Sequence, residues 1–447
     1  MYNKFRIVFV TCSNDPWIND IEDLFIKASK EINIEIIVIS SGKKREKNYI
    51  NLECIDNDIF FEKIKNRTKK NIELPKYIVQ RESAYYKASG KGSINDIFNK
   101  WDIEASFILR IIQPDIIFVW NGMATIRWVY ANSAKELNIP LFFLEKGMFP
   151  DSWYIDPYGI GFNSKPAKTK KIDNISSFDI NDFKNKIEEI DKKGKSAWGQ
   201  PDRINIKKLK QKLKINNKQK IIFFPGQVDD DTNIVLFSKY FKSTFDALKA
   251  VCDSIKNDAL FIIAKPHPKG ISNINDLNNV ISNKGVLISD INIIDAIELS
   301  DIIVTINSTV GFEALLRKKP VLFLGDSIVS NKKFTFQYRP GIELNEQIKM
   351  CLDDHYKNSS KNYHKALMFG AFLDKKYYLY KKSLDPLKER MHSIIKGRTP
   401  KKKNFEQNEI IDIFSEYKNT DIINSFEGRV LLLNALRKLK RKFLKSK

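Results

Sequence analysis

Short apolar runs alternate with longer segments of mixed polarity along most of the chain. In the first half the runs cover residues 5–11, 34–40, 116–120 and 141–145. In the second half they cover 221–225, 260–264, 286–289, 302–306 and 321–324. Strand-length runs separated by helix-length connections are typical of βαβ units. The pattern predicts an α/β protein with two doubly wound, Rossmann-like parallel sheets.

A stretch rich in Gly, Pro and charged residues, 192–203, separates the two series and has the composition of a linker. We therefore predict one Rossmann-like domain over residues 1–195, a linker over 196–204 and a second Rossmann-like domain over 205–385. Residues 386–447 contain no strand-like run and are predicted to be helical. The length of 447 residues fits two hydrophobic cores better than one.

Composition narrows the class of protein. Hydrophobic residues make up 43% of the chain, which excludes global disorder. The four cysteines are isolated from one another and from histidines, so we expect a reducing cytoplasm, no disulfide framework and no metal site. The N-terminus lacks a signal-peptide pattern, and no apolar stretch is long enough to span a bilayer. The formal charge of +22 favours anionic partners or reflects a Lys-rich composition.

Ligands of open α/β sheets bind beyond the carboxyl ends of the strands, so the residues that follow each run are the candidates for chemistry. The run 302–306 ends in Asn307, Ser308 and Thr309, followed by a helical pattern that contains Glu313. Hydroxyls at a helix start form a phosphate site together with the free backbone N–H groups. The same residues also suit an ordinary helix cap.

Lys265 and His267 follow the run 260–264, and His267 lies between two prolines that stiffen the loop. An imidazole and an ammonium group at one strand end are suited to a phosphate. The run 221–225 is followed by Gln227 and then by Asp229, Asp230 and Asp231. One of these acids could attack or stabilise a sugar centre, although acids at a loop also serve as helix caps.

The first half offers Asn121 and Glu145 at strand ends, and Asp156 in an aromatic-rich segment with Trp153. Aromatic and polar side chains together suit a carbohydrate, while the tryptophans could equally belong to the core. A carboxylate beside a glycine, as at Glu145, contributes little to packing.

Several segments taken together resemble the bacterial capsule polysaccharide synthesis family, which contains the Kps-type retaining β-Kdo transferases. They are WNG, LEKG, DPYGIG, PGQVDDD, KPHP and TINSTVGFEALLRKKPVLFLGD, within residues 118–326. The resemblance implies a GT-B fold with two Rossmann-like domains facing a cleft and an acceptor side in the first domain. It also implies CMP-Kdo as the donor, no metal or cofactor, and a lipid-linked acceptor at the cytoplasmic face of the inner membrane.

The resemblance also implies roles for individual residues. Lys265, His267, Ser308 and Thr309 would hold the CMP phosphate, with Gln227 and Asn307 also at the donor site and Glu313 near the ribose. His267 could also protonate the departing phosphate. Asp231 would be the nucleophile, with Asp229 and Asp230 as alternatives, and Glu145 the general base for the acceptor hydroxyl. Asn121 and Asp156 fall on the acceptor or sugar side.

Two other functions fit parts of the sequence. A CDP-polyol phosphate transferase would share the His-Pro pair and the Ser/Thr-rich helix start, but it needs no carboxylate nucleophile. Another CMP-sugar transferase of GT-B fold is a further alternative. A nucleic-acid-binding protein is suggested by charge alone, because no RNP, KH, zinc or helix-turn-helix signature occurs.

The last residues predict a basic amphipathic helix. Leu432, Leu436, Leu439 and Phe443 recur at helical spacing, and no acid occurs over 429–447. Lysines and arginines occupy most other positions from 437 to 447. Such a helix is expected to lie on an anionic membrane surface, although a helix packed on the body is the alternative.

Overall fold

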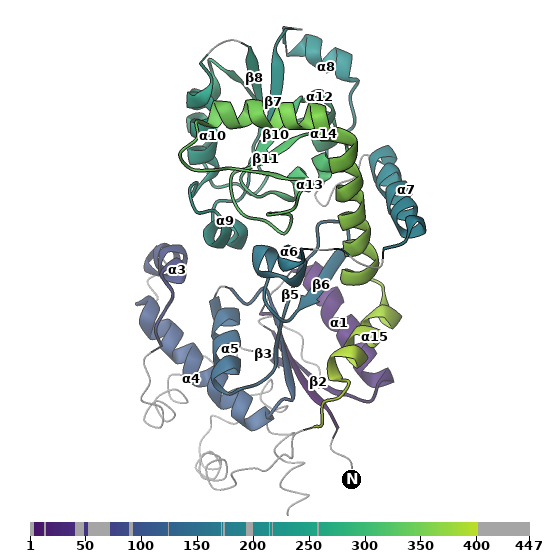
Figure 1. Cartoon of the computed structure of the whole chain (residues 1–447). Coiled ribbons are helices and arrows are strands. Elements are labelled where there is room, and N and C mark those ends of the chain that lie inside the picture. The colour runs from purple at the N-terminus through teal and green to yellow at the C-terminus, as the bar shows by residue number, and fades with distance from the viewer. Residues whose placement is uncertain are drawn as a thin grey trace, which may run out of the picture. The chain divides into compact units, whose positions relative to one another are not determined.

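The computed structural model describes residues 4–400 apart from 13–14, 41–48, 52–71, 89–92, 124, 171, 173–174, 194–199, 214, 217 and 257–258. The chain divides into two compact units (Figure 1). Unit 1 comprises Met1–Glu145, Ile155–Gly159 and Leu379–Lys447, and unit 2 comprises Lys146–Tyr154 and Ile160–Tyr378. Each unit is built on a largely parallel sheet, so the predicted α/β class with two Rossmann-like sheets is confirmed.

The first sheet, most of which belongs to unit 1, has the strand order β13-β6-β5-β4-β1-β2-β3. Its strands are β1 (Arg6–Val10), β2 (Glu35–Ser40), β3 (Tyr49–Asn51), β4 (Ile116–Trp120), β5 (Leu141–Lys146), β6 (Ser152–Asp156) and β13 (Leu379–Tyr380). The neighbours from β3 to β5 pair in parallel. All five residues of β4 are buried, because helices cover both faces of such a sheet.

The helices of unit 1 begin where the sequence supplies caps. In α1 (Pro16–Glu31), Asp15 accepts a hydrogen bond from the Trp17 amide and a proline opens the first turn. Ser93 caps α4 (Ile94–Ile112) in the same way. The other helices in the described part of unit 1 are α3 (Lys76–Ala88), α5 (Thr125–Glu136) and α15 (Leu384–Ile395), and α15 packs beside α1 (Figure 1).

The sheet of unit 2 has the order β12-β11-β10-β7-β8-β9, and every neighbouring pair is parallel. Its strands are β7 (Lys220–Pro225), β8 (Leu260–Lys265), β9 (Gly285–Leu287), β10 (Ile302–Thr305), β11 (Val321–Phe323) and β12 (Phe336–Gln337). The strand order reverses between β7 and β10, which is the switch point where ligands of such sheets bind.

Helices and short turns complete unit 2. They are η2 (Gly161–Asn163), α6 (Lys165–Lys168), α7 (Ser177–Lys193), α8 (Ile206–Lys212), α9 (Thr232–Phe237), α10 (Thr244–Ser254), α11 (Ile274–Ile281), α12 (Ile293–Leu299), α13 (Thr309–Leu315), α14 (Leu344–Phe372) and η3 (Leu373–Tyr377). The core of this unit contains apolar side chains of β7, β8, β10 and β11 packed on α10, α11 and α14.

The boundaries between the units differ from those we predicted at 195 and 385. Helix α7 belongs to unit 2 because it packs against α14, and Lys186 Nζ lies 2.6 Å from Asp374 Oδ1. The chain returns to unit 1 at residue 379, where β13 joins the first sheet and Lys388 forms an ion pair with Glu31 at 2.6 Å. Tertiary pairing of short segments, which composition does not reveal, sets these limits.

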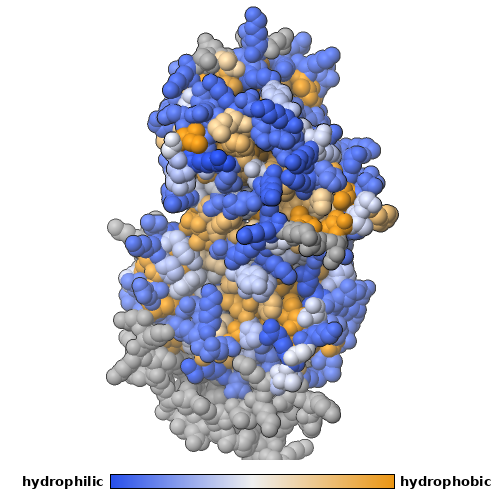
Figure 2. Space-filling view, in the orientation of Figure 1, coloured by the Kyte–Doolittle hydropathy of each residue, from blue (hydrophilic) through white to orange (hydrophobic). Residues whose placement is uncertain are grey.

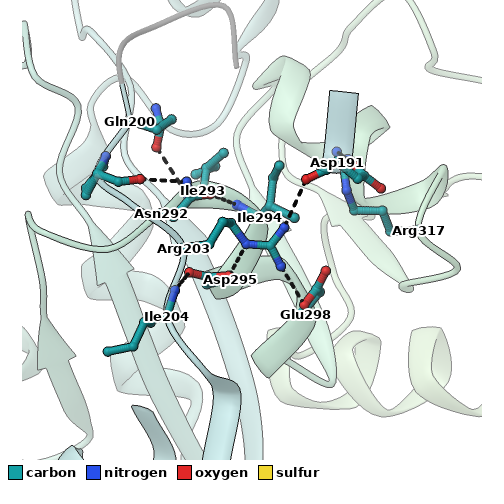
Figure 3. Close-up of polar contacts among 11 residues, drawn as sticks. Asp191, Gln200, Arg203, Ile204, Asn292, Ile293, Ile294, Asp295, Glu298 and Arg317 are labelled. Atoms are coloured by element: carbon teal, nitrogen blue, oxygen red, sulfur yellow. Dashed lines mark hydrogen bonds and ion pairs between the residues drawn. The ribbon is translucent and has the colours of Figure 1, made fainter. Parts of the chain in front are cut away.

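The described end of the predicted linker is anchored to α12 of unit 2 (Figure 3). Asn292 donates a hydrogen bond of 2.8 Å to the Pro201 carbonyl, and the Ile293 amide donates one of 3.1 Å to Gln200. Arg203 pairs with the fully buried Asp295 and, at 2.9 Å, with Glu298. Residues 200–204 therefore form part of unit 2.

The predicted amphipathic tail over 429–447 lies outside the described residues. The face drawn in Figure 2 is largely hydrophilic, as the abundance of lysine suggests. In the part of the chain that the structure describes, no helix has the length and hydropathy needed to cross a membrane.

Candidate functional site

The predicted donor residues gather at the carboxyl edge of the second sheet. Gln227 and Asp231 follow β7, Lys265 ends β8, and His267 follows it. Asn307 and Ser308 come after β10, and Thr309 and Glu313 lie on α13. Because β7 lies between β8 and β10, these groups surround the switch point of the sheet.

Gln227 and Asn307 join the two strands at the switch point. Gln227 Nε2 donates to Asn307 Oδ1 at 2.9 Å, and the Asn307 amide donates to Gln227 Oε1 at 3.0 Å. Asn307 Nδ2 also donates to the carbonyls of Asn233 and Asp326, at 2.8 and 3.1 Å. Both side-chain amides thus form hydrogen bonds within the protein. They support the loops at the switch point.

The loop after β8 fixes the orientation of His267. Its Nδ1 accepts a hydrogen bond of 3.0 Å from the Lys269 amide, so the neutral ring carries its proton on Nε2. Burial lowers the pKa of His267, and the nearby Asp231 carboxylate opposes that shift. A Cβ on Gly226 would lie 3.1 Å from the Lys265 carbonyl and 3.3 Å from the His267 amide nitrogen. The glycine therefore lets β7 and this loop approach closely.

Lys265, which the sequence places among the candidate phosphate ligands, is bonded within the protein. Its side chain is buried, and Nζ donates to the carbonyls of Ser289 and Ile291 at 2.8 and 2.7 Å. Burial lowers the pKa of Lys265. The ammonium group holds the loop after β9 against β8, a placement that the KPHP pattern alone could not reveal.

The three acids after β7 have different environments. Asp229 is bound on both oxygens, because Oδ1 accepts from the Thr244 amide at 2.6 Å and Oδ2 from the Ser272 hydroxyl. Asp230 is exposed. Asp231 is exposed and caps α9, and its Oδ1 accepts from the amide and side chain of Asn233 at 2.8 and 3.0 Å. These bonds orient the carboxylate through Oδ1.

Ser308 caps α13, with Oγ accepting from the Val310 amide at 3.3 Å, and Thr309 at the first helical position is exposed. Glu313 lies one turn further, where Arg317 Nη1 binds its carbonyl at 2.7 Å and approaches its Oε2 at 3.9 Å. Arg317 also pairs with Asp191 of α7, which Figure 3 shows beside the Arg203 network. Burial raises the pKa of Glu313, and Arg317 opposes this shift.

The predicted residues of unit 1 fall in two places. Asn121 follows β4, Glu145 lies near the end of β5, and Asn121 Nδ2 donates to Glu145 Oε2 at 2.6 Å. Asp156 ends β6 and is fully buried, with Oδ1 accepting from the amides of Tyr158 and Gly159 at 2.7 and 3.1 Å. Asp156 thus stabilises its own turn. The hydrogen bond between Asn121 and Glu145 is a separate contact.

Sequence reasoning missed two residues that lie near candidate groups, one in each unit. Thr244 accepts from the Gln227 amide and donates to the Gln227 carbonyl, both at 2.9 Å, and so holds the loop after β7. Arg127 of α5 lies in the electrostatic environment of Glu145, and burial lowers its pKa. Arg127 lies seven positions after the end of β4, whereas the sequence analysis considered only residues that directly follow an apolar run.

Among the described residues, no group of three or more His, Cys, Asp or Glu side chains could hold a metal ion.

Comparison with known proteins gives a match over much of unit 2. Residues 167–378 match the family described as "Capsule polysaccharide biosynthesis protein". Protein FixF of Sinorhizobium fredii is 29% identical over 217 residues, covering 47% of this chain and 48% of FixF. The capsule polysaccharide modification protein LipA of Neisseria meningitidis serogroup A is 27% identical over 231 residues, covering 47% of this chain and 31% of LipA. The chain thus spans about half or less of the length of these two relatives.

Among solved structures, that of Thermosulfurimonas dismutans KpsC, described as a β-Kdo 2,7 transferase, is 16% identical to this chain with a TM-score of 0.43. The alignment covers 87% of this chain and 99% of that chain. The UDP complex of MnaA from S. aureus is 14% identical with a TM-score of 0.37, covering 90% of this chain and 100% of that chain.

Proposed function

Because residues 167–378 match the family described as "Capsule polysaccharide biosynthesis protein", we propose that this protein is a glycosyltransferase of capsule or surface polysaccharide synthesis. We propose CMP-Kdo as its donor, a lipid-linked glycan as its acceptor, and transfer with retention as a β-Kdo linkage. The observation that carries the proposal is that His267, Ser308 and Asp231 all follow strands at the carboxyl edge of the second sheet, beside its switch point, and that Asp231 lies near enough to His267 to affect its pKa. We propose that the imidazole and hydroxyl at this edge bind a phosphate and that the carboxylate acts as the nucleophile.

The donor phosphate is proposed to bind between the His267 loop and the start of α13. The Nε2–H of a neutral His267 would donate to a phosphate oxygen, and the hydroxyls of Ser308 and Thr309 would donate to others. Lys265, Gln227 and Asn307 would act indirectly, because their polar groups hold the loops that present these donors. Glu313 is proposed to lie near the ribose, with its position set by Arg317.

The chemical step is proposed to begin at Asp231. Its Oδ2 would attack the anomeric carbon of Kdo, the bond to the phosphate oxygen would break, and CMP would leave with the bonding electron pair. The acceptor hydroxyl would then attack the glycosyl ester and release Asp231, while its proton passes to Glu145 as general base. Two displacements at one carbon retain its configuration. Asp229 is less suited to this role because both of its oxygens are already bound.

The location is proposed to be the cytoplasmic face of the inner membrane. The segment 429–447 combines leucines at helical spacing with a run of lysines and arginines and contains no acid. Each basic side chain near an anionic leaflet contributes about 1 kcal/mol, so partial engagement is enough to bring the protein to a lipid-linked acceptor.

A donor panel tests the proposal. The protein is incubated separately with CMP-Kdo, CMP-sialate and CDP-glycerol, and the release of CMP is followed by mass spectrometry. CMP release from CMP-Kdo is expected, and it should be far slower from the other two donors. Turnover of CDP-glycerol instead would point to polyol phosphate transfer, and turnover of CMP-sialate to a different CMP-sugar transferase. Either result would overturn the assignment of Kdo.

A further inference from the structure

Asn121 and Glu145 stand side by side where two neighbouring strands end. Strands β4 and β5 are parallel with Trp120 opposite Leu144, so the next residues on each strand are Asn121 and Glu145. The Asn121 amide continues this pairing with a hydrogen bond of 2.7 Å to the Leu144 carbonyl. The backbone thus fixes the relative position of the two side chains before any side-chain contact is considered.

The turn after β4 fixes the direction of the Asn121 side chain. Asn121 has φ +61° and Gly122 has φ +72°, a left-handed conformation that Asn and Gly tolerate. A Cβ on Gly122 would lie 2.7 Å from the Phe143 ring, so the turn lies close to β5. Asn121 Oδ1 accepts from the Met123 amide at 3.1 Å, which leaves Nδ2 to face β5.

The side-chain nitrogen of Asn121 forms a hydrogen bond with the Glu145 carboxylate. Asn121 Nδ2 donates a hydrogen bond of 2.6 Å to Glu145 Oε2. Asn121 is only 9% exposed, and Glu145 is half-buried. From α5, the charge of Arg127 also acts on Glu145, and the same guanidinium is near Cys12, Arg81 and Glu82.

We propose that Asn121 is a positioning residue that holds the Glu145 carboxylate, ionised and in one orientation, as the acceptor base, and that it is not itself a sugar ligand. The inference rests on the proposed function, in which Glu145 accepts the proton of the acceptor hydroxyl. An N–H donor favours the ionised carboxylate that a base requires. Because Oδ1 is bound to Met123 and Nδ2 to Glu145, the amide acts through its neighbour.

The substitution Asn121→Asp separates this role from a purely structural one. Aspartate has the same shape, tolerates the left-handed backbone and retains the acceptor for the Met123 amide. It replaces the N–H donor with an oxygen that faces Glu145, and two adjacent carboxylates share a proton. If Asn121 served packing and the turn alone, Asn121→Asp would be mild and Asn121→Leu the more harmful change.

The experiment measures transfer of Kdo from CMP-Kdo to a fluorescent alkyl Kdo glycoside, with CMP affinity and thermal stability measured in parallel. Asn121→Asp is expected to lower kcat about 10-fold to 100-fold, the scale for an impaired general base, and to leave CMP affinity unchanged. The acid limb of its pH–rate profile should move to higher pH, because the base must lose a shared proton. Asn132→Asp is the matched control, since Asn132 donates to Glu136 at 3.3 Å on the exposed side of α5.

Glu145→Gln, assayed alongside, distinguishes the failure of this inference from that of the proposed function. If Glu145→Gln transfers Kdo at the wild-type rate, the general base is misassigned and the role of Asn121 is refuted with it. If Glu145→Gln is slow while Asn121→Asp keeps the wild-type rate and pH profile, the positioning role alone is refuted. A wild-type protein that transfers no Kdo to this acceptor counts against both.

Discussion

Gln227 and Asn307 exchange two hydrogen bonds, of 2.9 and 3.0 Å, across the point where the strand order of the second sheet reverses. One residue follows β7 and the other follows β10, so the pair ties together the two loops that carry Asp231 and Ser308. The candidate donor site therefore rests on a network of neutral amides, and the charged and hydroxyl groups lie around it.

Loss of this pair should destabilise unit 2. In Gln227→Leu, the buried Asn307 amide and Oδ1 lose their partner, which costs about 1–3 kcal/mol for each group left unsatisfied. Denaturant unfolding measures the loss, with the exposed Gln211→Leu on α8 as the control. A double-mutant cycle with Asn307→Leu should give a coupling of about 0.5–3 kcal/mol. Strict additivity of the two substitutions would contradict the direct pairing.

His267→Ala is expected to weaken CMP binding about 10-fold or more, since a hydrogen bond to a charged group contributes about 1.5–3 kcal/mol. Calorimetry tests this, with the exposed His364→Ala on α14 as the control. Because burial lowers the pKa of His267, the ring is neutral near pH 7 and still donates through Nε2. CMP affinity should therefore stay level between about pH 7 and 8.5, above the ordinary histidine pKa of about 6.5. A steady loss of affinity as pH rises through that ordinary value would indicate a cationic ring instead.

The lowered pKa of His267 sets the direction in which pH changes the stability of the folded protein. A histidine whose pKa is lowered in the folded state binds fewer protons than in the unfolded chain. Its contribution to stability is therefore present above the unfolded pKa of about 6.5 and is lost as pH falls below it. His267→Ala should reduce the acid sensitivity of unfolding, measured by thermal denaturation between about pH 5 and 7. Unchanged acid sensitivity would contradict the lowered pKa.

The acids after β7 should respond differently to the same substitution. Asp229→Asn disturbs two hydrogen bonds, to the Thr244 amide and the Ser272 hydroxyl, and should cost about 1–3 kcal/mol of unfolding free energy. Asp230→Asn, at an exposed position, should be neutral. Asp231→Asn should also fold normally, because asparagine caps a helix as well as aspartate does. A stable Asp229→Asn variant would show that those bonds contribute little.

The sequence predicted which residues lie at the carboxyl edge of each sheet, because that placement depends only on the order of the strands. Residues that directly follow apolar runs were predicted to meet at the sheet edges, and His267, Asp231, Asn307 and Ser308 do lie at the carboxyl edge of unit 2. This succeeds because parallel strands all end at the same edge. The apolar runs themselves match the strands closely, since continuous burial on both faces leaves a strong signal.

The direction of individual side chains could not be predicted in the same way. Lys265 bonds to the carbonyls of Ser289 and Ile291, and Asp156 accepts from two amides in its own turn. Both contacts depend on loops whose course follows from tertiary packing. The compact units differ from the predicted domain limits for a similar reason, because the return of the chain through β13 involves only two residues.

Removal of residues 429–447 tests the proposed attachment to the membrane. The truncated protein should no longer sediment with phosphatidylglycerol vesicles at physiological salt, while its CMP affinity stays unchanged. The control is a full-length protein with the same tail residues in an order that lacks helical spacing, which should bind more weakly because the leucines no longer share one face. Sedimentation of the truncated protein with these vesicles would refute the role of the tail.

The most direct test of the account is the mass of the intact protein after incubation with CMP-Kdo in the absence of acceptor. A retaining transferase with Asp231 as nucleophile predicts a mass increase of one Kdo residue, located at Asp231 by peptide mapping and absent in Asp231→Asn. Addition of acceptor should discharge the adduct. An Asp231→Asn protein that turns over CMP-Kdo at the wild-type rate, or an adduct on a different side chain, would contradict the proposed mechanism.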